Sequence, residues 1–110
     1  MGQEFEIRDR IVEYLEKRNI LCWKDPKPIY TSKRGFSKSN GVPDIHAILP
    51  DGRYLGIEVK TKTGKLSDSQ KKFFEKVSHT KAIVILARSL DDVMNCLTKE
   101  KLFSSAEVDV

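Results

Sequence analysis

Hydrophobic side chains recur at helical spacing near the start of the chain. Between about residues 3 and 18 they include Ile7, Ile11 and Leu15, which fall on one face of a helix. Asn19 follows directly and is a plausible helix stop. The pattern predicts a first helix over residues 3–18, with one face packed against a core.

Two short apolar segments come after this helix. Residues 20–23 and 28–31 have the composition of strands, but Pro26 and Pro28 interrupt them, which is typical of an edge strand or a bent strand. Residues 32–41 are polar, basic and contain glycine, so we expect a mobile surface loop there.

Alternating polar and apolar positions then predict a hairpin. Segments 42–49 and 53–60 have the pattern of two strands, and Pro50, Asp51 and Gly52 separate them. Because side chains alternate across a strand, each segment has an apolar face and a face with polar groups. The apolar face consists of Ile45, Ala47, Leu49, Leu55, Ile57 and Val59, and the other face carries Asp44, His46, Tyr54, Gly56, Glu58 and Lys60.

The length of the hairpin loop decides whether the acids share a face. A two-residue turn ending at Gly52 would place Asp44 across from Val59, on the opposite side from Glu58. A three-residue loop, with Gly52 in the left-handed region and a G1 bulge, instead pairs residue 46 with residue 58. Both acids then lie on one face, and we predict this bulge or an equivalent one.

The second half of the chain supplies three more elements. Ser67 and Gln70 match the S-x-x-Q capping box, which predicts a helix over residues 67–78. Residues 81–88 are a β-branched apolar run typical of a buried strand, and residues 90–97 are expected to form a last helix. The order αβ(β)βαβα predicts an α/β protein with a mixed β-sheet flanked by helices.

Composition adds limits on size and location. A chain of 110 residues that is 39% hydrophobic can bury one modest core, so we expect a single domain over residues 1–110, frayed from about residue 104. Cys22 and Cys96 lie far apart without a CxxC pair, which favours reduced thiols over a zinc site or a disulfide. The chain has no 18-residue apolar run and no signal-peptide pattern, so we expect a soluble, intracellular protein.

Basic residues gather in two segments that flank the hairpin. Twenty Lys and Arg against sixteen Asp and Glu give a net charge of +4. The segments richest in Lys and Arg are residues 24–40 and 60–72. Lysine-rich loops are usually plain solvated surface, so charge alone does not establish a polyanionic partner. The candidate contacts to nucleic-acid phosphates are Lys33, Arg34, Lys38, Lys62 and Lys65.

The polar face of the hairpin has the residue types of a metal site. Asp44 and Glu58, held close together on a sheet, repel each other unless a divalent cation lies between them. Hard oxygen ligands favour Mg²⁺ or Mn²⁺, and the Val59 carbonyl is a candidate third ligand. Lys60 lies on the same face, where it would position water or offset phosphoryl charge. The alternative is a surface ion-pair set on a solvated face.

The motifs resemble those of a known nuclease family. Pro43-Asp44 followed by Glu58-Val59-Lys60 resembles the PD-(D/E)xK motif. The longer ordered set G-V-P-D-I, D-G-R-Y-L-G-I-E-V-K and G-K-L-S-D-S-Q-K-K-F resembles the virus-type replication-repair nucleases, the VRR-NUC family. The resemblance implies a small restriction-endonuclease-like fold and a Mg²⁺- or Mn²⁺-dependent DNA endonuclease, often selective for branched or flapped DNA. It also implies a bacterial or phage-infected cell, in its cytoplasm or nucleoid.

The family carries a further acid in its first helix, for which this chain offers several candidates. Glu4 falls on the same helical face as Ile7, Ile11 and Leu15, which favours it as a fourth site residue and metal ligand; the alternative is an exposed, fraying position. Gln70 is a candidate for contact with Lys60 or substrate, but as the third residue of a capping box its role is equally explained by helix capping.

Three hypotheses about function follow. The first is a nuclease that cuts a phosphodiester bond with metal-activated water, and the others are a non-catalytic or degenerate nucleic-acid-binding module and a small metal-binding regulatory domain. The presence of Asp44, Glu58 and Lys60 argues against the non-catalytic binding module. The two basic loops argue against the metal-binding regulatory domain. Cutting two strands symmetrically requires two active sites, so we expect a homodimer. Trp23 is open to two interpretations, base stacking or burial in the core, and the second is the more common.

Overall fold

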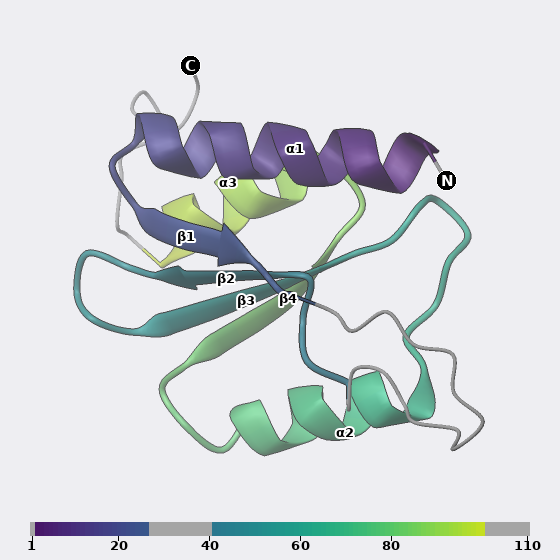
Figure 1. Ribbon diagram of the computed structural model, residues 1–110. Helices are drawn as coiled ribbons and strands as arrows, with labels where there is room; N and C mark the ends of the chain where they lie inside the picture. The colour runs from purple at the N-terminus through teal and green to yellow at the C-terminus, as the bar shows by residue number, and fades with distance from the viewer. Residues whose placement is uncertain (1, 27–40, 101–110) are drawn as a thin grey trace.

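The protein is a four-stranded sheet with helices on both faces. The computed structural model describes residues 2–26 and 41–100. The elements are α1 (Gly2–Lys17), β1 (Leu21–Lys24), β2 (Ile45–Ile48), β3 (Tyr54–Val59), α2 (Asp68–Val77), β4 (Ile83–Ala87) and α3 (Leu90–Lys99). Helices α1 and α3 lie over one face of the sheet and α2 lies over the other (Figure 1). None of these helices is both long and apolar enough to cross a membrane.

The sheet has the mixed topology that the element order predicts. Its strand order is β1-β2-β3-β4. Strand β2 pairs antiparallel with both β1 and β3, whereas β3 and β4 are parallel. A parallel pair needs a crossover, and α2 supplies it. The predicted strand at 20–23 is confirmed as β1, while the one at 28–31 and the basic loop after it lie outside the described residues.

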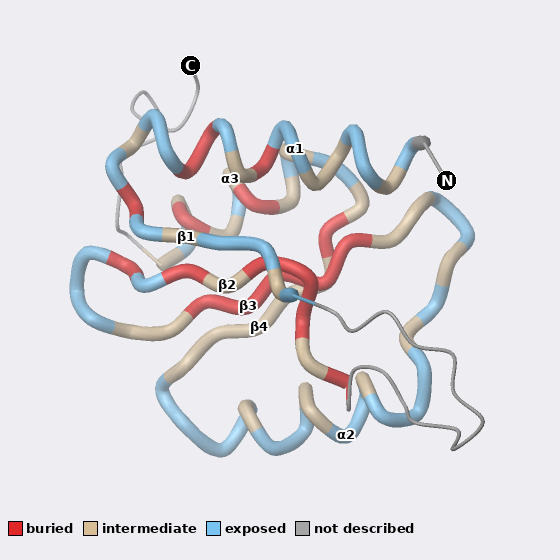
Figure 2. Tube along the Cα trace, in the orientation of Figure 1, coloured by how far each residue is buried: buried red, intermediate tan, exposed pale blue. Residues whose placement is uncertain are grey.

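The core fills the space between the sheet and the α1–α3 layer. Its largest fully buried members include Ile11 and Leu15 from α1, Leu97 from α3, and Ile57 from β3. Figure 2 shows the buried positions along these strands and helices, and none along α2. The apolar stripe predicted for α2 is therefore only half-buried, so this helix depends on its ends for its position as well as on packing.

The β2–β3 hairpin has the predicted parity but a different register. Leu49 N donates to Arg53 O at 2.8 Å and Gly52 N donates to Leu49 O at 2.8 Å, which closes a three-residue loop. Gly52 has φ +94°, as the bulge requires. His46 pairs with Gly56, so the predicted pairing of 46 with 58 is wrong by two residues. Extended by one residue beyond Ile45 and Ile57, the same register places residues 44 and 58 across from each other. Pro50 explains the shift, since it lacks the N–H that a ladder residue donates.

Helix α2 starts at the predicted capping box. The Ser67 hydroxyl accepts from Gln70 N at 3.2 Å, and the Gln70 side-chain oxygen accepts from Ser67 N at 2.8 Å. Two backbone donors at the helix start thereby gain partners.

Gly41 joins the loop before β2 to the start of α2. It has φ +83°, and a Cβ atom there would lie 2.2 Å from the Ser69 carbonyl oxygen. A side chain is thus excluded by both backbone conformation and space. A similar close approach occurs at Gly56, where a Cβ would lie 2.7 Å from Pro43 Cγ. The two glycines let the segment that carries Asp44 pack tightly between α2 and β3.

Gly41→Ala is expected to lower the free energy of unfolding by about 3 kcal/mol or more, because the methyl group overlaps the backbone of α2. Gly52→Ala is the matched control: its φ is also positive, but nothing lies within 4 Å of a Cβ there, so only about 1–2 kcal/mol of backbone cost is expected. Urea unfolding of both variants measures the difference. Equal losses would show that the contact with α2 contributes nothing.

Candidate active site

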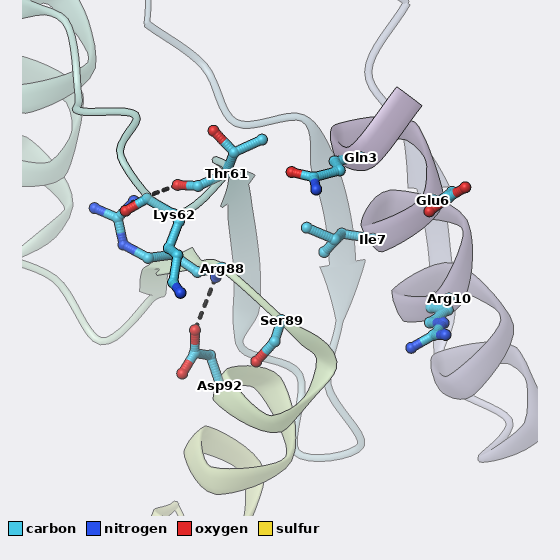
Figure 3. Close-up of a pocket in the computed structure, with 9 residues that line it drawn as sticks. All are labelled: Gln3, Glu6, Ile7, Arg10, Thr61, Lys62, Arg88, Ser89 and Asp92. Carbon is cyan, nitrogen blue, oxygen red and sulfur yellow. Dashed lines mark hydrogen bonds between the residues drawn. The ribbon is translucent and has the colours of Figure 1, made fainter. Parts of the chain in front are cut away.

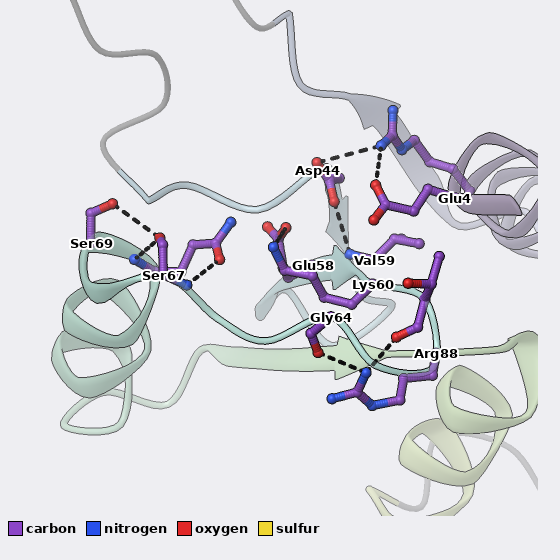
Figure 4. Close-up of polar contacts among 12 residues, drawn as sticks. Glu4, Asp44, Glu58, Val59, Lys60, Gly64, Ser67, Ser69 and Arg88 are labelled. Atoms are coloured by element: carbon purple, nitrogen blue, oxygen red, sulfur yellow. Dashed lines mark hydrogen bonds and ion pairs between the residues drawn. The ribbon is translucent and has the colours of Figure 1, made fainter. Parts of the chain in front are cut away.

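Asp44 and Glu58 form a buried acidic pair at one end of the β2–β3 hairpin. Asp44 is 7% exposed and Glu58 is 3% exposed. Asp44 Oδ2 accepts a hydrogen bond from Val59 N at 2.8 Å, so the β3 backbone orients its carboxylate (Figure 4). Directly paired residues have Cβ atoms about 5 Å apart, which lets both carboxylates reach one ion. The two acids predicted to act together are indeed neighbours.

Lys60 lies beside Glu58 as the alternation predicts. Its Nζ is 3.6 Å from Glu58 Oε2, and its side chain is 18% exposed. Its backbone N–H donates to Ala87 O at 3.1 Å, which holds the end of β3 against β4. The cation therefore approaches the acidic pair from a fixed part of the sheet.

Arg8 connects the first helix to the acidic pair. Its Nη2 lies 3.9 Å from both Glu4 Oε1 and Asp44 Oδ1 (Figure 4). Glu4 thus lies on the site side of α1, as predicted from helical phase, although its own side chain is more exposed, at 38%. Sequence reasoning missed Arg8. Its position four residues after Glu4, the spacing of an ion pair on one helix face, was the sequence feature that could have identified it.

Gln70 is committed at least in part to the helix cap. Its side-chain oxygen accepts the Ser67 N–H at 2.8 Å. This leaves the side-chain NH₂ group for other donations. The capping interpretation is therefore confirmed, and a contact with Lys60 or with substrate stays a prediction.

Arg88 fastens the loop that follows Lys60. Its Nη1 donates to the Gly64 carbonyl oxygen at 2.9 Å (Figure 4). The same nitrogen donates to the carbonyl oxygens of Thr61 and Lys62. A guanidinium that binds three carbonyls of one loop restricts that loop's backbone. Arg88 was also missed, since a contact with backbone carbonyls leaves no pattern in the sequence.

A cavity of about 600 Å³ opens between the start of α1 and the ends of β3 and β4. The cations Arg10, Lys62 and Arg88 line it together with the acids Glu6 and Asp92 (Figure 3). Open α/β sheets commonly bind ligands beyond the carboxyl ends of parallel strands, and β3 and β4 are such strands. The mixed charge gives only a weak preference for an anion.

The predicted phosphate contacts are only partly within the described residues. Lys62 and Lys65 are exposed in the loop after β3, where a bound strand could reach them. Lys33, Arg34 and Lys38 lie outside the described residues.

His46 belongs to a hydrogen-bonded set on the same face of the sheet. Its Nδ1 is 2.6 Å from the Tyr54 hydroxyl and its Nε2 is 2.7 Å from Asp25 Oδ1. Burial, with a contribution from Asp25, raises the pKa of Tyr54 to about 12. The pair of contacts fixes the imidazole ring in place. Sequence reasoning did not identify Asp25.

The donor set suits a hard divalent cation in part. The described residues contain no group of three or more His, Cys, Asp or Glu side chains placed to hold a metal. Mg²⁺, however, is usually held by one or two carboxylates, with water and substrate phosphate as its other ligands. The two buried carboxylates fit that pattern.

Cys22 and Cys96 are free thiols, as expected, and burial raises the pKa of each.

Comparison with known proteins agrees with the motifs and the geometry. A model of the VRR-NUC domain matches residues 6–91. The chain belongs to the VRR-NUC family. A solved structure described as a VRR_NUC domain is similar, with a TM-score of 0.65 and 26% identity over 88% of this chain and 95% of that chain. No curated protein matched the chain. Membership places this VRR-NUC protein among nucleases, whose substrates are nucleic acids.

Arg88→Ala is expected to speed amide hydrogen exchange in the loop after Lys60, especially at Gly64, whose N–H donates to Thr61 O at 3.2 Å. Lys62→Ala is the matched control because that side chain is exposed in the same loop. Mass spectrometry of peptides spanning this loop measures the exchange. Unchanged protection in Arg88→Ala would contradict the fastening role.

Proposed function

We propose that this VRR-NUC protein is a Mg²⁺- or Mn²⁺-dependent DNA endonuclease that is selective for branched, flapped or junction DNA. The observation that carries the proposal is the buried pair Asp44 and Glu58 at the end of the β2–β3 ladder, with Asp44 Oδ2 accepting from Val59 N at 2.8 Å and Lys60 Nζ 3.6 Å from Glu58. A solvated ion-pair set would leave the carboxylates exposed. Burying two like charges side by side has a cost, which Arg8 and Lys60 offset in part and a bound divalent cation would offset further.

The cation would be held by Asp44 and Glu58, with the Val59 carbonyl as a third ligand. The N–H and C=O of one strand residue point to the same side, so the Val59 carbonyl faces the side on which its N–H meets Asp44. When bound, Mg²⁺ or Mn²⁺ polarises a phosphoryl oxygen and lowers the pKa of a coordinated water. Glu4 is an outer candidate, because it reaches Asp44 through Arg8.

The remaining groups would bind and orient the DNA strand. Lys60 would hold the attacking water near the phosphate or offset the negative charge that develops on it. Arg8 would keep the Asp44 carboxylate aimed at the site from α1. Lys62 and Lys65 would contact backbone phosphates, which gives binding that is sensitive to salt and tolerant of sequence. Lys33, Arg34 and Lys38, which lie outside the described residues, would add to the same electrostatic attraction.

A binding module that does not cut is the alternative from a different class. It would use the same basic residues and would need neither a metal nor the acidic pair. The buried, ordered acids favour the nuclease, because a module without catalysis gains nothing from them.

Cleavage of DNA should require both the acidic pair and a divalent cation. Asp44→Asn, Glu58→Gln and Lys60→Ala are each expected to lower the rate by about 100-fold or more, since each removes a group acting on the reacting phosphate. Rates are measured on flapped, branched, single-stranded and plain duplex DNA with Mg²⁺, Mn²⁺ or EDTA.

Asp51→Asn provides the control, because it removes an exposed carboxylate from the loop of the same hairpin. Thermal unfolding of every variant separates loss of activity from loss of folding. Cleavage that ignores EDTA or survives Asp44→Asn would refute the metal-dependent nuclease. DNA binding without cleavage under every metal would support the binding module.

Two copies are expected on a branched substrate, since one active site cuts one strand at a time. Light scattering with size-exclusion chromatography should give a mass of two chains, free or bound to junction DNA. A monomer that cuts both strands at symmetric points in one binding event would contradict the dimer.

A further inference from the structure

An exposed aromatic and apolar strip lies on the sheet beside the acidic pair. Because paired residues share a face, Leu21, Ile48 and Tyr54 form one row across β1, β2 and β3. Trp23, His46 and Gly56 form the next row. The same register, extended by one residue past Ile45 and Ile57, puts residues 44 and 58 in the row after it. The strip therefore leads directly from the edge strand to Asp44 and Glu58.

The part of this strip on β1 and β2 is largely uncovered. Trp23 is 44% exposed, Leu21 is 66% exposed and Ile48 is 37% exposed. Helix α2 packs on β4, at the far side of the same face, while α1 and α3 cover the opposite face (Figure 1). Trp23 is thus not the core residue that a tryptophan in a small domain usually is.

Trp23 is also held in a defined position. Its ring centroid lies 5.5 Å from that of His46, and the His46 ring lies 5.7 Å from that of Tyr54. Hydrogen bonds at both nitrogens of His46, with the Tyr54 hydroxyl and the Asp25 carboxylate, fix the middle ring of the three. An indole supported in this way presents a flat surface at little entropic cost on binding.

We propose that Trp23 is the stacking surface for an unpaired nucleobase next to the phosphate that is cut. The inference rests on the proposed nuclease function. A phosphate held at Asp44 and Glu58 brings its neighbouring nucleosides with it. Trp23 lies two residues along the strands from Asp44 and one strand to the side, which places the two positions about 8 Å apart, within the reach of an adjoining base.

This placement favours DNA that is not fully paired. In a duplex both faces of a base are covered by its neighbours, so a base must leave the stack before it can lie on an indole. Flaps and branches contain such bases already. Stacking on an aromatic ring accepts every base, so Trp23 would select the shape of the substrate and not its sequence.

Trp23 is the single tryptophan of the chain, so its fluorescence reports this contact directly. The protein is titrated with a flapped duplex and with a blunt duplex of the same sequence, with Ca²⁺ in place of Mg²⁺, so that the acidic pair still holds a hard cation while cleavage is slowed. Stacking is expected to quench the emission with the flapped DNA and to leave it nearly unchanged with the blunt duplex.

Affinity for the two DNAs is then compared among variants by anisotropy of labelled DNA. Trp23→Ala is expected to weaken binding of flapped DNA by about 5- to 100-fold and of blunt duplex far less. Trp23→Phe should restore most of the affinity because it keeps a ring. Leu21→Ala is the matched control, an exposed residue on the same face of the same strand.

The outcomes separate this inference from the proposed catalysis. Quenching by flapped DNA together with selective loss in Trp23→Ala supports the stacking role, whether or not the protein cuts DNA. Absence of quenching, or equal losses in Trp23→Ala and Leu21→Ala, overturns it. A change in Trp23 emission with protein concentration alone, paralleled by self-association in sedimentation, would overturn it too and make this face an interface between copies.

Discussion

The pairing register of β2 with β3, which puts Asp44 and Glu58 on the same face of the sheet, is the constraint on which the candidate site depends. Asp44 and Glu58 share a face only if the loop between the two strands leaves an odd number of residues unpaired. The three-residue loop that ends at Gly52 does so. Where the backbone ladder stops, the Asp44 carboxylate accepts the next N–H, that of Val59. The same pairing that forms the sheet therefore also aims the acid.

The acidic pair imposes an electrostatic condition on everything around it. Two carboxylates about 5 Å apart repel by about 3 kcal/mol at an effective dielectric constant near 20. Arg8 approaches from α1 and Lys60 from the end of β3, so each acid has a cation within 4 Å. Helix α1 is thus part of the site as well as part of the core, and the interior packing of Ile11 and Leu15 determines where Arg8 lies.

Local patterns carried most of what the sequence could reveal. Helical spacing placed Glu4 on the correct side of α1, the capping box located the start of α2, and strand alternation put Glu58 and Lys60 together. The hairpin register was predicted in parity but not in position, because Pro50 lacks the N–H that the predicted closing pair with Tyr54 requires.

Contacts between distant segments could not be read in this way. The partners of three residues are far away along the chain: Asp44 for Arg8, the Gly64 carbonyl for Arg88 and His46 for Asp25. No rule of sequence spacing connects these residues with their partners. The exposure of Trp23 is of the same kind: it follows from α2 lying over β4 and leaving β1 open.

The parity of the hairpin also limits how the gene can change. Inserting or deleting one codon within β3, ahead of Glu58, would turn the residues beyond it to the opposite face, so that the site would lose Glu58 to the core side. A codon added to the loop itself can be absorbed by a longer loop while the pairing of the strands stays the same. Among descendants of this chain, the lengths of the strand segments between the loop and the two acids should therefore stay fixed, while the loop between them varies.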